Sequence, residues 1–187
     1  MAEQCILILG GARSGKSRFA QEMALRFSGR VLFVATGEAL DEEMRQRIEE
    51  HKRRRPPSWR TVEVTTGVGR KIREDIGDAQ IVIVDCLTLL VSNVIGWHGN
   101  DPEQITPELV DKRLAVEIEE LVGCIEDSNA TFILVSNEVG MGLVPENSLG
   151  RLYRDLLGKV NQVLAERADC VYFMLSGIPL KLKGDGV

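Results

Sequence analysis

Residues 10–17, Gly-Gly-Ala-Arg-Ser-Gly-Lys-Ser, have the types and spacing of a phosphate-binding loop. They fill every fixed position of the pattern G-x-x-x-x-G-K-[ST], directly after an apolar run at residues 5–9. In this pattern the backbone N–H groups wrap a polyphosphate, Lys16 reaches its β and γ phosphates, and Ser17 offers a hydroxyl to Mg²⁺. The alternative is a chance glycine-rich turn. Because the preceding run and the following helical pattern both agree with the motif, the sequence predicts a nucleoside triphosphate site.

Asp85 is a second candidate, because it ends the apolar run Ile-Val-Ile-Val at residues 81–84. A buried strand that ends in a carboxylate is typical of a Walker B element, whose aspartate holds Mg²⁺, often through water. The alternative is an acidic residue that simply ends a strand. Beside a P-loop, Mg²⁺ needs such a carboxylate, so Ser17 and Asp85 are the predicted metal residues.

Residues 51–63, His-Lys-Arg-Arg-Arg-Pro-Pro-Ser-Trp-Arg-Thr-Val-Glu, form the second unusual segment. One interpretation is a solvated helix face, because Glu43 and Arg47 and the two pairs that follow are spaced i, i+4. The other is an anion site: a helix that stops before two prolines would carry His51 and the four cations at 52–55 toward a loop. Spacing alone leaves His51 open between a structural and a catalytic role, and leaves Trp59 open between stacking on a ligand and closing a helix-to-strand corner.

A third motif, Ser-Asn-Glu-Val-Gly-Met-Gly at residues 136–142, follows an apolar run. Polar groups at the carboxyl end of a strand commonly face the ligand in α/β proteins, although an ordinary turn with a helix cap is the alternative. The sequence has no Asn-Lys-x-Asp element, which argues against a regulatory GTPase of the Ras kind. The second histidine, His98, is expected to be solvated.

The elements that must position these residues alternate along the chain. Runs rich in Val and Ile predict buried parallel strands at residues 5–9, 31–35, 81–84, 132–136 and 171–175, with a possible short strand at 60–64. Helical periodicity predicts helices at residues 17–27, 41–54, 107–125 and 149–168, and residues 96–107 read as an exposed loop. The predicted fold class is α/β: a P-loop NTPase with a RecA-like, mostly parallel sheet flanked by helices. Right-handed crossovers then bring the P-loop and the end of the Asp85 strand to one edge.

Composition narrows the class of protein further. The 187 residues, 44% of them hydrophobic, fit a single nucleotide-binding domain over residues 1–187. A net charge of −5 gives no field to hold a nucleic acid, so we expect no nucleic-acid partner. The four cysteines form no C-x-x-C pair and are expected to be reduced and structural. Without a targeting or membrane-spanning pattern, the expected location is cytoplasmic, with no membrane insertion.

Four motifs together carry a family resemblance: the P-loop sequence, His-Lys-x-x-Arg-Pro-x-x-Trp-Arg-Thr-x-Glu, Ser-Asn-Glu-Val-Gly-Met-Gly-x-Val-Pro-Glu-Asn, and Ser-Gly-Ile-Pro-Leu-Lys near the end. The chain resembles the bifunctional adenosylcobinamide kinase / adenosylcobinamide-phosphate guanylyltransferase family of cobalamin biosynthesis, over nearly its whole length. In that family a P-loop site phosphorylates the aminopropanol hydroxyl of adenosylcobinamide with ATP or GTP. A histidine then attacks the α-phosphate of GTP and holds GMP until the corrinoid phosphate displaces it, which gives adenosylcobinamide-GDP.

The resemblance implies that His51 is the nucleophile and Lys16 a second catalytic residue. A neutral imidazole is a competent nucleophile near pH 7. Some members carry two adjacent histidines, whereas Glu50 precedes His51 here. The implied nucleotide-binding residues are Gly10, Gly11, Ala12, Arg13, Ser14, Gly15, Lys16, Ser17, Ala35, Thr36, Gly37, Lys52, Arg53, Arg54, Arg55, Glu63 and Asp85. The implied cofactor is Mg²⁺, and the implied assembly is a homotrimer with the corrinoid in a groove between subunits.

Three other functions stay open at this point. A P-loop small-molecule kinase would use no covalent nucleotide, a RecA-like oligomeric ATPase would need a basic surface for DNA, and a nucleotide sensor would bind GTP without turnover. For the bifunctional enzyme, one P-loop must present both the α and the γ phosphorus. We therefore expect the helix that ends near His51 to shift, with Gly37 and residues 56–57 absorbing the change.

Overall fold

The computed structural model describes residues 4–38, 42–96 and 106–184. A seven-stranded sheet with the order β3-β2-β4-β5-β1-β6-β7 organises them. Neighbouring strands are parallel except for β6 and β7, which form an antiparallel hairpin. The strands are β1 (Gln4–Gly10), β2 (Val31–Ala35), β3 (Arg60–Glu63), β4 (Ile81–Asp85), β5 (Thr131–Val135), β6 (Cys170–Leu175) and β7 (Ile178–Lys183).

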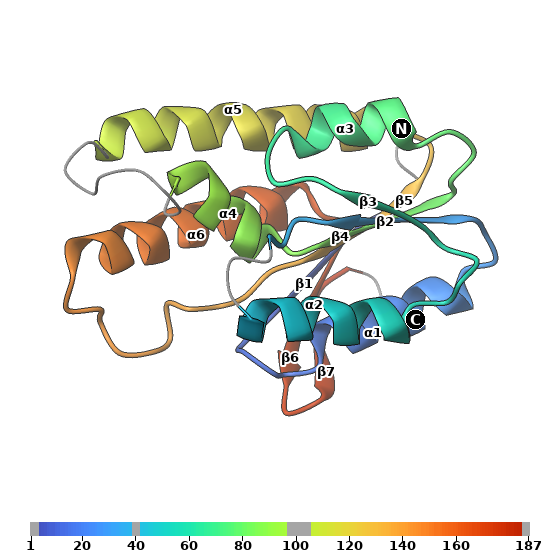
Figure 1. Ribbon diagram of the computed structural model, residues 1–187, viewed down its shortest axis with the longest axis horizontal. Coiled ribbons are helices and arrows are strands. Elements are labelled where there is room, and N and C mark those ends of the chain that lie inside the picture. Colours follow the sequence, from blue (N-terminus) through green and yellow to red (C-terminus); the bar gives the residue numbers. More distant parts are fainter. Residues whose placement is uncertain (1–3, 39–41, 97–105, 185–187) are drawn as a thin grey trace.

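Helices cover both faces of the sheet (Figure 1). The helices α1 and α2 lie on one face, and α3, α4, α5 and α6 lie on the other. Their bounds are α1 (Lys16–Arg26), α2 (Glu42–Arg54), α3 (Val68–Asp75), α4 (Leu87–Ile95), α5 (Pro107–Glu126) and α6 (Ser148–Arg167). This is the three-layer arrangement that a parallel sheet requires, since its strands are apolar on both sides.

The core divides into two layers by the alternation of side chains along each strand. On β5, Ile133 and Val135 pack in the layer beneath α1, whereas Phe132 and Leu134 pack in the layer beneath α4, α5 and α6. All four are buried. Removing a buried ring such as that of Phe132 costs about 3–5 kcal/mol, so these layers hold the strand ends in fixed register.

The five main predicted strands and all four predicted helices are present, and their ends differ from the predicted ones by at most one residue. The possible strand at 60–64 is β3, and it pairs in parallel with β2. The chain runs from β1 through the P-loop into α1, and the predicted mostly parallel sheet flanked by helices is confirmed. The middle of the predicted loop at 96–107, and with it His98, lies outside the described residues.

Three elements were not predicted. The helix α4 is mostly apolar and contacts β5, α5 and α6, so it shows no continuous polar face. In the sequence its residues are therefore hard to separate from the apolar run of β4. The helix α3 is only eight residues long and follows Gly67. The strand β7 pairs with β6 alone at the edge of the sheet, and its exposed Ile178, Leu180 and Leu182 resemble no buried strand.

The cysteines are free thiols, and Cys5, Cys124 and Cys170 are buried, as expected of small apolar side chains. Burial raises the pKa of Cys5 to about 12 and that of Cys86 to about 11. Among the residues described, no helix is both long and apolar enough to cross a membrane.

Candidate functional site

The P-loop connects β1 to α1 and depends on two glycines. At Gly10, with φ 149°, a Cβ atom would lie 2.6 Å from the carbonyl oxygen of Met174 on β6. At Gly15, the residue before α1, φ is 94°, a left-handed value that favours glycine. Larger residues are strained at both positions, so the loop keeps its backbone close and its N–H groups accessible at the start of α1.

Backbone hydrogen bonds hold the P-loop from two sides. The N–H of Glu138, just after β5, donates to the carbonyl of Gly10 at 3.0 Å. The N–H of Gly177, in the β6–β7 turn, donates to the carbonyl of Ser14 at 3.0 Å. The loop is therefore braced by two segments that are far from it in sequence.

Lys16 lies in the first turn of α1 and is only 7% exposed. Its Nζ donates to the carbonyl of Gly11 at 2.6 Å and lies 3.4 Å from Oγ of Ser14. Burial lowers the pKa of Lys16, while Cys86 and Asp85 act to raise it. Because the raised pKa of Cys86 keeps that thiol neutral at pH 7, the carboxylate of Asp85 is the charge that acts on Lys16.

Asp85 ends β4, next to Ala35 on β2 and Val135 on β5. Since Ile81 and Ile83 pack in the layer beneath α1, alternation places Asp85 on the same face as the P-loop. Ser17, half-buried, follows Lys16 in the first turn of α1. Among the described residues no group of three or more His, Cys, Asp or Glu could hold a metal. One hydroxyl and one carboxylate fit Mg²⁺, which in such sites is bound largely by phosphates and water.

The segment after β2, Ala35, Thr36 and Gly37, is fixed to the end of β4. Thr36 is fully buried; its hydroxyl donates to the carbonyl of Cys86 at 2.6 Å and accepts from the N–H of Cys86 at 2.9 Å. From α4, Nδ2 of Asn93 donates to the carbonyls of Thr36 at 2.8 Å and Thr65 at 3.0 Å. Asn93 thus joins the exits of β2 and β3.

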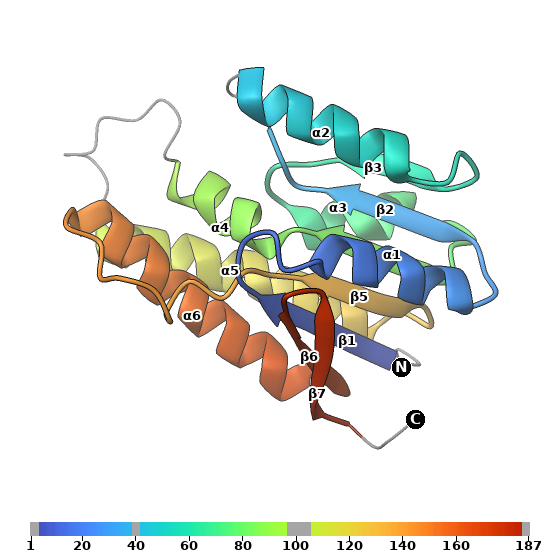
Figure 2. The same ribbon diagram turned by 90° about the horizontal axis from the view of Figure 1, so that it is seen from below.

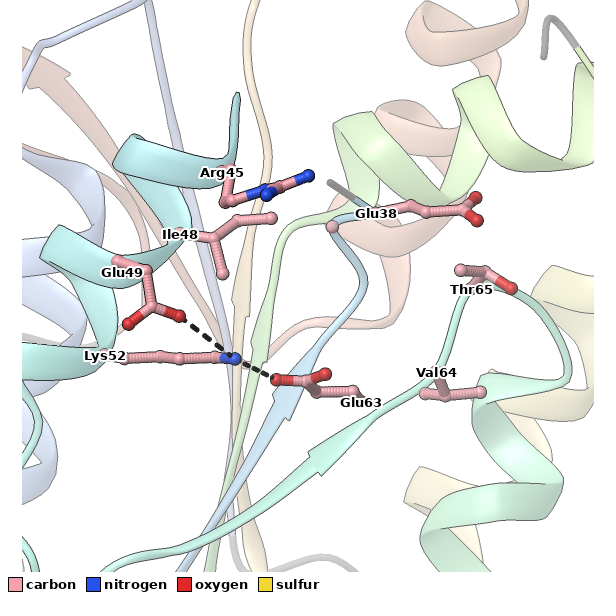
Figure 3. A pocket seen from close by; sticks show the side chains of 9 residues that line it. Glu38, Arg45, Ile48, Glu49, Lys52, Glu63, Val64 and Thr65 are labelled. Carbon is pink, nitrogen blue, oxygen red and sulfur yellow. Dashed lines mark ion pairs between the residues drawn. The ribbon is translucent and has the colours of Figure 1, made fainter. Parts of the chain in front are cut away.

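A pocket of about 410 Å³ lies between α2 and these exits (Figure 3). In its lining, Nζ of Lys52 forms ion pairs with Glu63 at 2.7 Å and Glu49 at 3.7 Å. The hydrogen bond with Glu63 is the main cause that raises the pKa of Lys52. The pocket brings together three predicted residues, Gly37, Lys52 and Glu63, and its other lining residues are Glu38, Arg45, Ile48, Glu49, Val64 and Thr65.

The predicted basic segment divides into two parts. His51, Lys52, Arg53 and Arg54 lie in the last turns of α2, where Lys52 and Arg53 are exposed; the side chains of His51 and Arg54 are outside what is described. His51 immediately precedes Lys52, which lines the pocket, and follows Ile48 by three residues. The expectation that all four cations extend toward a loop is wrong for Arg55, which turns inward.

The Arg55 guanidinium lies 3.7 Å from the centre of the Phe33 ring on β2, and Trp59 stacks on the same ring at 6.4 Å between centroids. Trp59 therefore closes the corner between α2 and β3. Burial lowers the pKa of Arg55, against the opposing effects of Asp85 and Glu63. Within the described part of the chain, the buried Nε and Nη1 of Arg55 have no hydrogen-bond partner. Prolines at 56 and 57 force the chain to leave α2 here, which turns Arg55 toward the sheet.

Sequence reasoning missed the other pocket residues and Asn93. Residues 45, 48, 49 and 52 recur at helical spacing and mark one face of α2, a signal that was available. For Asn93 the signal was a single amide side chain in a mostly apolar helix.

Comparisons with known proteins agree over nearly the whole chain. The family model "Cobinamide kinase / cobinamide phosphate guanyltransferase" matches residues 6–182. The "Bifunctional adenosylcobalamin biosynthesis protein CobU" of Escherichia coli (strain K12) is 42% identical over 180 residues, 95% of this chain and 99% of that protein. The CobP protein of Pseudomonas aeruginosa is 41% identical over 179 residues, 96% of this chain and 97% of that protein.

Solved structures share the fold at low identity. The RadB recombinase superposes with a TM-score of 0.51 at 13% identity, over 91% of this chain and 73% of that one. A Pyrococcus horikoshii OT3 protein superposes with a TM-score of 0.57 at 8% identity, over 97% of this chain and 86% of that one. These two structures show the RecA-like fold alone, whereas the full-length relatives show the family. The chain belongs to the cobinamide kinase / cobinamide phosphate guanyltransferase family of cobalamin biosynthesis.

Proposed function

We propose that this enzyme carries out both reactions of its family at the carboxyl edge of the sheet, and that His51 is the residue that carries GMP. One observation supports it above the others: two regions suited to a nucleotide, the P-loop after β1 and the Lys52–Glu63 pocket after β2 and β3, lie at the carboxyl ends of the strands, on either side of β4 and β5. A kinase without guanylyl transfer requires only the first of them.

In the kinase reaction, residues 10–17 hold the triphosphate of ATP or GTP. Lys16, already directed into the loop at the carbonyl of Gly11, contacts the β and γ phosphates. Ser17 and Asp85 would hold Mg²⁺, which would neutralise charge on the phosphates. The acceptor is the hydroxyl of adenosylcobinamide. Catalysis consists mostly of positioning and charge stabilisation.

In the guanylyl transfer, an imidazole nitrogen of His51 attacks the α-phosphorus of GTP. A P–N bond forms, the P–O bond to the β-phosphate breaks, and pyrophosphate leaves with the electron pair. An oxygen of adenosylcobinamide phosphate then attacks the same phosphorus, which restores the histidine. The pocket beside Lys52 takes the nucleoside, and Glu63 accepts hydrogen bonds from the N–H groups of guanine. Lys52, released from Glu63, pairs with phosphate.

Arg55 binds phosphate groups of the nucleotide between the P-loop and the Lys52–Glu63 pocket. Its guanidinium lies within the electrostatic influence of both Asp85 and Glu63 and has buried N–H groups without partners among the described residues. Buried N–H donors without a hydrogen-bond partner cost free energy, and a phosphate oxygen would accept hydrogen bonds from them. The remaining contacts implied by the family fall on Ala35 to Gly37, Arg53 and Arg54.

The assembly belongs to the same proposal. A homotrimer with the corrinoid bound between subunits would enlarge a site that one chain of this size offers only in part. Cytoplasmic location, where ATP and GTP are available, goes with it. Sedimentation equilibrium checks the trimer: a protein that stays a monomer at every concentration with full activity would exclude a shared site.

The deciding experiment uses GTP labelled at the α or the γ phosphate. The protein is incubated with Mg²⁺ and labelled GTP, denatured and tested for retained label. Label from α-labelled GTP that is stable in base, is lost in acid and disappears in His51→Asn supports the guanylyl-histidine. With nucleotide still bound reversibly but no retained label, His51 leaves the mechanism and the simple kinase is the better account. The Glu50→Gln variant is a matched control, and it should keep the label.

A further inference from the structure

Asn137 lies at the carboxyl ends of the strands, beside the P-loop, in the motif that follows β5. The N–H of Ser136 donates to the carbonyl of Ile8 at 3.0 Å, and that of Glu138 donates to Gly10 at 3.0 Å. These N–H groups, two residues apart, bond carbonyls two residues apart on β1, so the parallel pairing of β5 with β1 continues beyond the end of β5. The backbone is therefore extended through Glu138, and the N–H of Asn137 points the other way, to Oγ1 of Thr88 at 2.8 Å.

Alternation along this extended segment decides which face each side chain takes. Val135 packs beneath α1, and the hydroxyl of Ser136 donates to Oδ1 of Asn161 on α6, on the opposite face. Asn137 consequently belongs to the α1 face and Glu138 to the α6 face. Oε1 of Glu138 accepts from the N–H of Gly140 at 2.7 Å, within its own turn.

On the α1 face, Asn137 lies between the two parts of the phosphate site. Val135, two residues earlier, is paired both with Asp85 on β4 and with Ile8 on β1. The helix α1, which carries Lys16, packs over β5, β4 and β1 (Figure 2). Asn137 lies two residues beyond Val135, in the direction in which β1 leads into the P-loop.

The backbone of Asn137 is fixed on both sides. In addition to the bond from its N–H to Thr88, its carbonyl accepts from Nδ2 of Asn161 at 3.0 Å. Asn161 is 5% exposed and is itself held by Ser136. Such a fully hydrogen-bonded support restricts where the carboxamide of Asn137 can reach, which is the requirement for a preorganised donor.

We propose that the carboxamide of Asn137 is a catalytic donor of the kinase step, bonded through Nδ2 to a non-bridging oxygen of the γ-phosphate. The assignment rests on the proposed function and adds a residue to it. As the acceptor hydroxyl attacks, a new O–P bond forms and the bond from the γ-phosphorus to the β–γ bridging oxygen breaks. The nucleoside diphosphate leaves with the electron pair, the hydroxyl proton passes to water, and Asn137 stabilises the charge on the phosphoryl oxygens.

The test compares two half-reactions in the same variants. Asn137→Ala removes the donor, and Asn137→Asp keeps the shape but replaces the donor with a negative charge. Phosphorylation of adenosylcobinamide by ATP reports on the γ-phosphate, and labelling of the protein by α-labelled GTP reports on the α-phosphate. Glu138→Gln, one residue away but on the other face, is the control.

For both Asn137 variants we expect kcat of the kinase step to fall about 100-fold, a typical loss for one donor to a developing oxyanion. The rate of guanylylation should stay within about threefold of the wild type, and the melting temperature within about two degrees. In Glu138→Gln, the rates of both reactions should likewise stay within about threefold, and the melting temperature within about two degrees. Kinase activity that survives in Asn137→Ala overturns the assignment. So does an equal loss of both reactions with a lowered melting temperature, because that identifies a structural residue. If the wild type itself lacks kinase activity, the proposed function fails instead.

Discussion

The guanidinium of Arg55 lies 3.7 Å from the centre of the Phe33 ring, so the last of the four cations at 52–55 packs on the sheet. A cation over an aromatic ring gains about 0.5–2 kcal/mol, which offsets only part of the cost of burying its N–H groups. An anion that bonds the buried Nε and Nη1 of Arg55 would therefore stabilise this arrangement, as expected of a binding residue.

Replacing Arg55 with methionine should separate binding from stability. The apolar side chain keeps the packing on Phe33 and removes a half-buried charge, so the melting temperature should stay the same or rise. Because a hydrogen bond to a charged group contributes about 1.5–3 kcal/mol, KM for GTP in the guanylylation should increase at least tenfold, approximately. Thermal unfolding and steady-state labelling measure the two effects. In Arg26→Met, an exposed control on α1, neither should change; a lower melting temperature with unaltered KM in Arg55→Met would mean that the arginine is only structural.

Asn93 should act on the nucleotide pocket through the exits of β2 and β3. Asn93→Leu leaves the carbonyls of Thr36 and Thr65 without their donor, which costs about 1–3 kcal/mol and loosens two walls of the pocket. We expect KM for GTP in the guanylylation to rise about three- to tenfold, with KM for ATP in the kinase step nearly unchanged. Parallel titrations of the two substrates check this, with Ser92→Ala on the same helix as control. Equal changes in both constants would contradict the connection.

Glu117 should matter for stability alone. Its buried carboxylate accepts from the N–H groups of Gly67 at 2.7 Å and Val68 at 2.8 Å, and so caps the start of α3 from α5. Glu117→Gln presents an amide N–H₂ to one of these donors, and we expect the free energy of unfolding to fall by about 1–3 kcal/mol. Urea denaturation measures it, with the exposed Glu119→Gln as control. Loss of guanylylation at a temperature where the variant stays folded would show that this cap also acts on the site.

Alkaline pH should destabilise the fold through its buried thiols. The pKa of Cys5 is about 12 in the folded chain, above the ordinary value of 9.0, because burial disfavours the thiolate. Stability from this thiol is therefore complete below pH 9 and is lost as the pH rises toward 12. Between pH 8 and pH 10, Cys5 should lower the free energy of unfolding by about 1 kcal/mol. Urea unfolding of wild type and Cys5→Ala at both values checks it; an identical loss in the two proteins would assign the effect to other groups.

GTP should change the amide exchange of α2 and the turn that follows it. The Lys52–Glu63 ion pair joins α2 to β3, and binding of guanine by Glu63 would release it. We expect slower exchange for residues 42–60 with GTP bound, while α5 stays unchanged as an internal reference. Identical exchange rates with and without GTP would contradict a shift of this helix.

Much of the fold was readable from local patterns. The P-loop, the strand that ends in Asp85 and the four amphipathic helices follow from short-range rules: glycine where a side chain would clash, apolar runs for buried strands, and 3.6-residue periodicity. The resemblance identified from four motifs was confirmed by the family model and the full-length relatives. The nucleotide and metal residues stay predictions, although the structure gathers many of them at one edge.

The remaining features depend on contacts between segments far apart in the sequence. The mostly apolar α4 has no continuous polar face for a periodicity to mark, and the exposed β7 forms only because β6 offers it an edge. That Arg55 turns inward depends on Phe33, 22 positions earlier, and the face taken by Asn137 depends on register with β1 and on Asn161. Residue types and their local spacing were enough to predict which groups could carry the chemistry, because both are written along the chain. Only the tertiary structure decided which of them meet, because burial and hydrogen bonding act between side chains that chain order does not bring together.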